Sequence, residues 1–263
     1  MKRINTLILS LILATAWVSS AAALTPEEKG MAIAVENDKR DNGFQDYKAK
    51  SVMILKNRHG EKSTRYLHFK VLEVKGDGDK NLTVFDRPRD IKNTAFLNYT
   101  HPLGDDDQWL YLPALKRVKR ISSSNKSGPF IGSEFAYEDL TSQEVEKYTY
   151  KWIRDEDFQG QKSFVVERYP AYENSGYFRQ VVWIDQEHYQ TLKVDFYDRK
   201  NDLLKTLVYS GYNKYLDKYW YPDQMFMENH QTGKTTLLKW SGYKFKNGFK
   251  KRDFSKNRLK RAH

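Results

Sequence analysis

The sequence predicts a mainly β fold: a single large antiparallel curved sheet or incomplete β-barrel, with an N-terminal helix and a helical or loop lid. Three observations support this prediction. About a dozen short segments alternate apolar and polar residues, which is the period of half-buried strands. Most of these segments are joined by hairpin-length links such as RHG, FQGQ, RKND and QTGK. Aromatic residues make up 14% of the chain, and such side chains suit wide pleated surfaces.

The first residues have the pattern of an export signal. Lys2 and Arg3 precede an apolar segment that runs from Leu7 to Val18, and the small residues SSAAA follow it. This pattern predicts a signal peptide over residues 1–23 with cleavage after Ala23. An uncleaved membrane anchor is the alternative, but the apolar segment is short for a membrane span. Residues 24–263 are then expected to form one domain, located in the periplasm of a Gram-negative bacterium.

One long helix is predicted directly after the signal. Thr25 is a candidate N-cap, Pro26 takes the first helical position, and Glu28 stands three residues after the cap. The helix should end near Asn42-Gly43. Its apolar face, Met31, Ala34 and Val35, is narrow, so we expect the helix to pack against something larger.

The strands follow from residue 47 onward in two groups separated by one long connection. The basic C-terminal stretch FKKRDFSKNRLKRAH is expected to be a frayed helix. The predicted strand segments are DYKAKSVMILKN, KSTRYLHFKVLEVK, NLTVFDRP, DIKNTAFLNYT, DQWLYLP and KRVKRIS, and then VEKYTYKWIRDEDF, KSFVVERYP, YFRQVVWID, QTLKVDFYDR, LLKTLVYSGYNKYLD, WYPDQMFMEN and TTLLKWSGYKF.

Net charge and the absence of cysteine limit the possible partners and chemistry. The formal net charge of +11 favours acidic partners, and outside the cytoplasm nucleic acid is excluded in favour of anionic lipid headgroups. Lysines on edge strands also protect β-proteins from aggregation, so individual lysines need no partner. No cysteine is present, no G-x-S-x-G motif occurs, and the six histidines are not at metal-ligand spacing. We therefore predict no metal, no cofactor and no enzymatic activity, although spacing alone leaves a carboxylate pair for glycoside hydrolysis open.

The connection between the two strand groups carries the most specific pattern. It reads WLYLPALKRVKRISSSNKSGPFIGSEFAYEDL: an aromatic strand, a basic strand, a Ser/Gly stretch and an apolar segment. Such a segment could fold as a mobile lid over the mouth of a curved sheet, or it could plug the core permanently. The cations of the basic strand would suit phosphate or carboxylate headgroups.

This stretch resembles the signature region of the LolA-like outer membrane lipoprotein-sorting proteins, specifically their longer branch, which is often associated with exporters of the RND/MMPL type. The segments YFRQVVWIDQEHYQTLKVDFYDRKNDLLKTL and MAIAVENDKRDNGFQDYKAKSVMILKNRHGEKSTRYLHFK are similar to later and earlier parts of the same family. The resemblance covers nearly all of residues 25–250. It implies an open β-barrel that holds acyl chains, with lipid or an acylated protein as cargo.

A carrier of this kind needs an apolar lumen rather than a catalytic group, because burial of acyl chain supplies about 0.8 kcal/mol per CH₂. We expect residues 24–263 to form a monomeric lipid- or lipoprotein-binding domain that carries cargo toward the outer membrane. The candidate lid and rim residues are Tyr111, Arg117, Arg120, Phe130, Ile131, Phe135, Tyr137 and Leu140. The candidate cavity-lining residues are Met53, Leu55, Leu67, Phe69, Val71, Phe96 and Val182, provided that the strand register places them inward.

Other functions remain possible at this stage. The chain could be a periplasmic adaptor of an RND-type exporter with a filled core and no lipid cargo. An enzyme acting on lipids is a further alternative. An outer-membrane barrel is disfavoured, because KRVKRI and TYKWIRDEDF carry charges on both faces of their strands.

Overall fold

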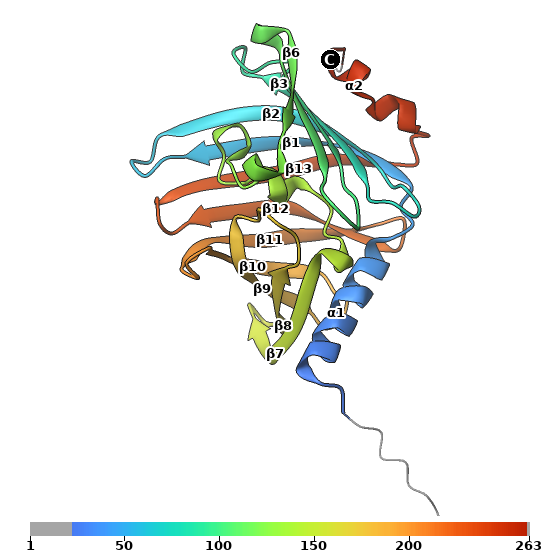
Figure 1. Ribbon diagram of the computed structural model, residues 1–263, viewed down its shortest axis with the longest axis vertical. Coiled ribbons are helices and arrows are strands. Elements are labelled where there is room, and N and C mark those ends of the chain that lie inside the picture. The colour runs from blue at the N-terminus through green and yellow to red at the C-terminus, as the bar shows by residue number, and fades with distance from the viewer. Residues whose placement is uncertain (1–22, 262–263) are drawn as a thin grey trace, which may run out of the picture.

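Thirteen antiparallel strands form one sheet in the computed structural model, which describes residues 23–261 (Figure 1). The order across the sheet is β6-β5-β4-β3-β2-β1-β13-β12-β11-β10-β9-β8-β7, so β6 and β7 are free edges and the barrel is open. This confirms the predicted fold class. The strands are β1 (Asp46–Lys56), β2 (Lys62–Leu72), β3 (Lys80–Arg87), β4 (Ala95–Tyr99), β5 (Asp107–Leu112), β6 (Arg117–Ile121), β7 (Tyr148–Phe158), β8 (Gln161–Pro170), β9 (Tyr177–Asp185), β10 (Thr191–Asp198), β11 (Leu203–Tyr215), β12 (Tyr219–Asn229) and β13 (Lys234–Phe245).

Helix α1 (Pro26–Asp41) begins where the capping pattern predicts. The Glu28 backbone N–H donates to the Thr25 hydroxyl at 3.2 Å, and the Thr25 N–H donates to the Glu28 carboxylate at 2.8 Å. The predicted signal peptide lies outside the described residues except for Ala23.

The predicted apolar face of α1 is partly wrong. Met31 and Val35 are exposed, and the buried residues are Gly30, Ile33 and Ala34. The helix packs closely against β7, where a Cβ on Gly30 would lie 2.7 Å from the backbone nitrogen of Trp152. The contact stripe is shifted because the small residue permits this close approach of helix and strand.

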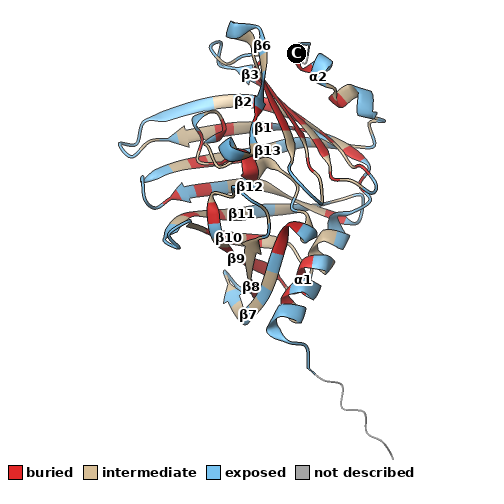
Figure 2. Ribbon diagram, in the orientation of Figure 1, coloured by how far each residue is buried: buried red, intermediate tan, exposed pale blue. Residues whose placement is uncertain are grey.

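Apolar side chains are buried on both faces of the sheet (Figure 2). The larger core lies inside the curve and contains Met53, Leu67, Phe69 and Phe96 with residues from β8 to β13. On the outer face, Leu82, Val84, Ala95, Leu97 and Trp109 pack against the C-terminal segment. That segment forms η6 (Lys251–Phe254) and α2 (Lys256–Leu259), and it is anchored rather than frayed because Phe254 and Leu259 are fully buried.

The long connection from β6 to β7 crosses the inside of the curved sheet, and we call residues 122–147 the plug. It contains four short 3₁₀ turns: η2 (Ser123–Asn125), η3 (Phe130–Gly132), η4 (Tyr137–Leu140) and η5 (Val145–Lys147). The remaining short helix, η1 (Pro113–Leu115), joins β5 to β6. Because the plug starts at one free edge of the sheet and ends at the other, it spans the gap that a closed barrel would seal with hydrogen bonds.

Candidate functional site

A cavity of about 1780 Å³ lies between the inner face of the sheet, the C-terminal part of α1 and the end of the plug. Its sheet wall comes from β1, β2, β11, β12 and β13, and its other walls are residues 37–43 of α1 and the following turn, and residues 139–146 of the plug. The volume exceeds the ~300–1,000 Å³ of usual small-ligand pockets. The cavity is therefore large enough for an extended apolar ligand.

Aromatic residues dominate the sheet wall of the cavity. The ring of Phe69 packs against the ring of Trp240 with centroids 4.3 Å apart, and Tyr47 and Tyr221 meet at 5.3 Å. Tyr209, Tyr212 and Trp220 add further rings, with Met53, Met225 and Leu238 between them. Apart from Tyr47, Met53 and Phe69, these residues come from the three C-terminal strands β11, β12 and β13.

The plug fills the other part of the interior. Phe130 and Phe135 are each only 1% exposed, and Phe130 packs against Phe96 and Tyr137 with ring centroids 5.3 and 5.5 Å apart. The guanidinium of Arg65 donates to the carbonyl of Ile131, and the Gln108 amide donates to that of Tyr137 at 3.0 Å. The segment is thus packed and hydrogen-bonded from both sides, as in the alternative in which it plugs the core.

A buried ion pair holds the middle of the plug to β11. Lys205 Nζ donates to Asp139 Oδ2 at 2.6 Å and to the Glu134 carbonyl at 2.9 Å, and both charged side chains are only 4% exposed. Asp139 also accepts from the Tyr177 hydroxyl and from the Ala136 N–H, each at 2.7 Å. A charge this deeply buried is tolerated only with such partners, so the arrangement specifies one position of the plug.

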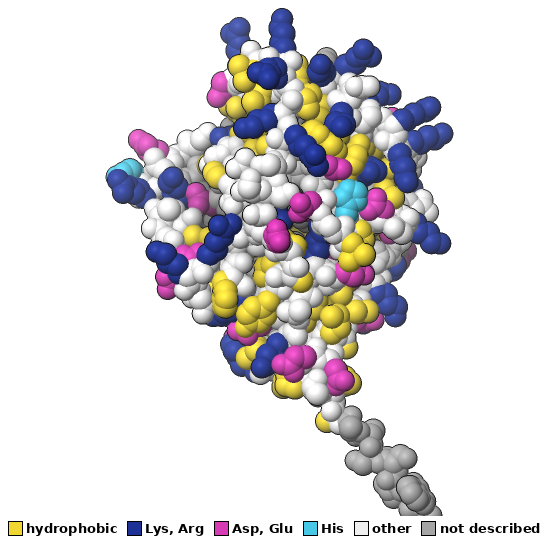
Figure 3. Space-filling model, in the orientation of Figure 1, with side chains coloured by type: hydrophobic (Ala, Val, Ile, Leu, Met, Phe, Trp, Pro, Cys, Tyr) yellow, Lys and Arg dark blue, Asp and Glu magenta, His cyan; other side chains and the backbone are white. Residues whose placement is uncertain are grey.

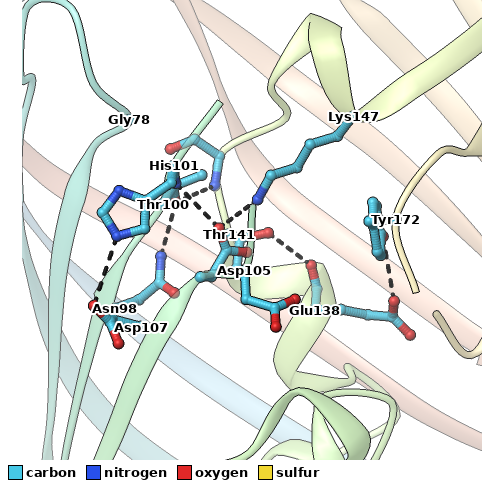
Figure 4. Close-up of polar contacts among 12 residues, drawn as sticks. Gly78, Asn98, Thr100, His101, Asp105, Asp107, Glu138, Thr141, Lys147 and Tyr172 are labelled. Atoms are coloured by element: carbon cyan, nitrogen blue, oxygen red, sulfur yellow. Dashed lines mark hydrogen bonds and ion pairs between the residues drawn. The ribbon is translucent and has the colours of Figure 1, made fainter. Parts of the chain in front are cut away.

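A second polar network ties the C-terminal end of the plug to neighbouring turns (Figure 4). Lys147 forms an ion pair with Asp106, and the backbone N–H of Ser142 donates to the Thr100 hydroxyl at 3.2 Å. His101 contacts Asp77 at 2.8 Å. Gly78 is required here, because a Cβ at this position would lie 2.5 Å from the Thr100 carbonyl oxygen.

Carboxyl groups gather on one side of the cavity, whose lining also contains the cations Arg40, Lys75, Lys214, Lys218 and Lys250. Burial and the nearby carboxylates of Asp41 and Glu144 together raise the pKa of Asp79 to about 7. Burial likewise raises the pKa of Glu144 to about 7, with a contribution from Asp38 and against the effect of Lys147. Carboxyl groups with a pKa near 7 are partly protonated at neutral pH, so this cluster carries less negative charge than its composition suggests.

The structure places the predicted cavity residues on the inner side of the sheet. Met53, Phe69 and Val71 line the cavity itself. Leu55, Leu67, Phe96 and Val182 belong to or pack against the inner core but lie outside the cavity wall. The period-two alternation grouped these residues on one face but left open which face is the inner one, and sequence alone did not show how much of that face the plug covers.

The predicted lid and rim residues are divided among four places. Phe130 and Leu140 line the cavity, and Ile131, Phe135 and Tyr137 lie in the inner core outside it. Tyr111 packs on the outer face with the C-terminal segment.

The two rim arginines lie on β6, away from the cavity wall. Arg117 and Arg120 are exposed, and Arg120 Nη2 pairs with Asp107 Oδ1 at 2.7 Å. Figure 3 shows the lysine and arginine side chains gathered at the end of the molecule that carries β6 and α2. The prediction that Arg117 and Arg120 form the cavity rim is therefore wrong, and the cations that line the cavity are other residues.

Sequence analysis missed the aromatic wall built by β11, β12 and β13. The aromatic residues of this wall stand in the segments LVYSGYNKY, WYPDQMF and KWSGYKF, but most of them are not two residues apart. Strand periodicity alone therefore does not group them on one face.

Two other kinds of site were sought in the described part of the chain. Within residues 23–261, no group of three or more His, Cys, Asp or Glu side chains is arranged to hold a metal ion. Over the same residues, no helix is long and apolar enough to cross a membrane.

Comparison with known proteins identifies the family. A family model described only as an uncharacterized protein matches residues 77–261. The crystal structure of a "putative outer membrane lipoprotein-sorting protein domain" from Vibrio parahaemolyticus is 59% identical, with a TM-score of 0.88 over 89% of this chain and 99% of that one. The chain belongs to the LolA-like family of outer membrane lipoprotein-sorting proteins.

Two further structures extend the LolA-like comparison. A DUF1329 family protein from Desulfovibrio piger is 30% identical, with a TM-score of 0.85 over 90% of this chain and 100% of that one. A LolA superfamily protein from Nitrosomonas europaea shares the fold at 18% identity, with a TM-score of 0.70 over 89% of this chain and 99% of that one. The comparison with curated proteins gave no match.

Proposed function

We propose that this protein is a periplasmic carrier that binds the acyl chains of a lipid or of a lipidated protein in the cavity and moves them toward the outer membrane. The observation that carries the proposal is the aromatic-walled cavity of about 1780 Å³ beside the plug. Membership of a lipoprotein-sorting family supports the same reading. Binding would be non-covalent, and no catalytic step is part of this role.

The energetics of acyl-chain burial suit such a site. Each buried CH₂ contributes about 0.8 kcal/mol, so a chain of ordinary length binds tightly without any charged contact. The apolar wall of Met53, Phe69, Met225 and Leu238 offers that environment. A headgroup left at the mouth would meet both carboxyl groups and cations of the cavity lining.

The adaptor alternative predicts a filled core, and only the plug side of the interior is filled. An exporter of the RND/MMPL type remains a proposed partner that would supply or receive the cargo. In that arrangement the carrier would act between the pump and the outer membrane.

The first test is native mass spectrometry of protein purified from the periplasm without detergent, followed by solvent extraction of any bound molecule. A stoichiometric lipid or acylated peptide would support the proposal and name the cargo. An empty protein that also fails to take up a fluorescent fatty acid would refute it and favour the adaptor.

A matched pair of variants tests the cavity directly. Met225 lines the cavity, whereas its neighbour Phe226 is exposed on the opposite face of the same strand. Met225→Trp should occupy part of the lumen and weaken fatty-acid binding about tenfold or more, equivalent to about two lost CH₂ contacts. Phe226→Trp should leave binding unchanged. Equal affinities in both variants would place the acyl site elsewhere.

A further inference from the structure

The outer face of the central strands carries a band of apolar side chains that runs across four neighbouring strands. Val208 stands opposite Phe226, Phe226 opposite Leu237, and Leu237 opposite Ile54. These residues alternate with inward side chains such as Met225 and Leu238, so they point away from the cavity. Phe226 is 38% exposed.

A group of lysines borders this band toward one end of the strands. Lys48 on β1 stands directly opposite Lys70 on β2 and opposite Lys244 on β13. Between this ladder and the band lie Lys239 and Lys50. Like charges directly opposite each other on neighbouring strands destabilise a sheet, so the arrangement costs folding stability.

These lysines have no ion-pair partner in the described part of the chain, although the ring of Phe249 lies against Lys70, with its centroid 5.7 Å from Lys70 Nζ. No ion pair among residues 23–261 includes any of the five lysines, Lys48, Lys50, Lys70, Lys239 and Lys244. Helix α2 packs on β4 and η6 packs on β3, and the segment that contains them carries more cations than carboxylates. Two outward carboxylates, Asp86 and Glu228, lie on the nearby strands β3 and β12, and Asp86 contacts His68 at 3.0 Å.

We propose that this outer face docks on a membrane surface that contains anionic lipids. The lysines supply the electrostatic attraction and the band supplies apolar side chains that enter the headgroup region. Surfaces that bind at the membrane interface typically combine flexible unpaired lysines with exposed aromatic and aliphatic side chains. Each cation near an anionic membrane surface raises the affinity about fivefold.

A bilayer fits this surface better than an acidic protein does. The two principal cavities of the molecule are lined by neither the band nor the lysine ladder, so neither of them offers this face a pocket for an anchoring side chain. The ring of Tyr66 on β2 stands opposite Val52 on β1, next to the band, and this tyrosine is 44% exposed. Cargo and membrane would then contact opposite faces of the same strands, and the two activities are separable.

The experiment is co-sedimentation with phosphatidylcholine vesicles in which about a third of the lipid is phosphatidylglycerol, compared with pure phosphatidylcholine. The wild type should bind the anionic vesicles at low salt and release them at high salt. The triple variant Lys48→Gln, Lys70→Gln, Lys244→Gln should bind about 100-fold more weakly. Phe226→Ser should lose about five- to tenfold through the apolar contact.

A second triple variant is the matched control, with the same change in net charge at exposed lysines elsewhere: Lys39→Gln, Lys162→Gln and Lys200→Gln. It should bind almost as well as the wild type. Equal losses in both triple variants would reduce the effect to net charge and overturn the proposal. A wild type that ignores anionic vesicles at low salt would also overturn it, in favour of an acidic protein partner.

Vesicle binding must also be separated from extraction of lipid into the cavity. Met225→Trp should sediment with anionic vesicles like the wild type, because its change lies on the inner face. The lysine variant should keep its affinity for a fluorescent fatty acid, which also shows that it is folded. Loss of sedimentation in Met225→Trp would assign vesicle binding to the cavity and overturn the docking surface.

Discussion

Lys205→Met should destabilise the protein by removing the only charge that Asp139 pairs with among the described residues. The two side chains are 4% exposed and 2.6 Å apart, so the substitution leaves a buried carboxylate with only the Tyr177 hydroxyl and Ala136 N–H as donors. Breaking one side of such a pair costs about 3–5 kcal/mol. The two remaining donors favour the lower end, so we expect the free energy of unfolding to fall by about 3 kcal/mol.

Guanidinium unfolding followed by tryptophan fluorescence measures this loss. Adding Asp139→Asn to Lys205→Met should restore about 1–2 kcal/mol, because the buried group is then neutral and still hydrogen-bonded. Lys193→Met is the control, since its pair with Asp195 at 2.8 Å is more exposed and should cost less than about 1 kcal/mol. Similar losses for Lys193→Met and Lys205→Met, or no rescue by the double substitution, would show that the ion pair does not hold the plug.

For three other substitutions the structure determines whether folding stability rises or falls. Gly30→Ala should destabilise this protein by about 1–3 kcal/mol in thermal unfolding, because the Cβ would meet the backbone of Trp152. The same substitution would stabilise an isolated helix, so a rise in stability would refute the close packing of α1 on β7. Glu144→Gln should raise the free energy of unfolding by about 1–2 kcal/mol near pH 8 and leave it unchanged at pH 4. The reason is that a carboxyl whose pKa is raised in the folded state destabilises the fold progressively as the pH rises from about 4 to 7. An equal effect at both pH values would contradict that raised pKa. Lys48→Glu should stabilise by about 0.5–1 kcal/mol by replacing two like-charge pairs with opposite ones, and a loss would show that the ladder is not repulsive.

Local pattern was sufficient for most of the fold. The capping residues Thr25 and Glu28 fixed the start of α1, and the alternation in β1 and β2 grouped Met53, Leu67 and Phe69 on one face, which the structure places inward. Short links between alternating segments correctly indicated an antiparallel meander. These features depend on neighbours along the chain, which is why a single sequence contains them.

The site depended on residues that meet only after folding, and here sequence reasoning was limited. The carboxyl groups at the cavity mouth come from α1, the turn after β2 and the plug. Asp41 of α1 and Glu144 of the plug are more than a hundred residues apart in the sequence. The basic strand β6 was placed at the rim because Arg117 and Arg120 lie near the plug in sequence. In space β6 is the free edge of the sheet, where exposed cations discourage pairing with other strands.

The fixed position of the plug constrains how cargo can enter. A mobile lid would leave its underside loosely held, whereas Phe130, Phe135 and Asp139 are buried and each is fixed by specific contacts. Opening by release of the plug would expose those phenylalanines and break a buried ion pair, at a cost of several kcal/mol. Entry through the mouth beside the C-terminus of α1 breaks none of these contacts. Access should therefore depend on the residues around Asp79 and Glu144 rather than on movement of the plug.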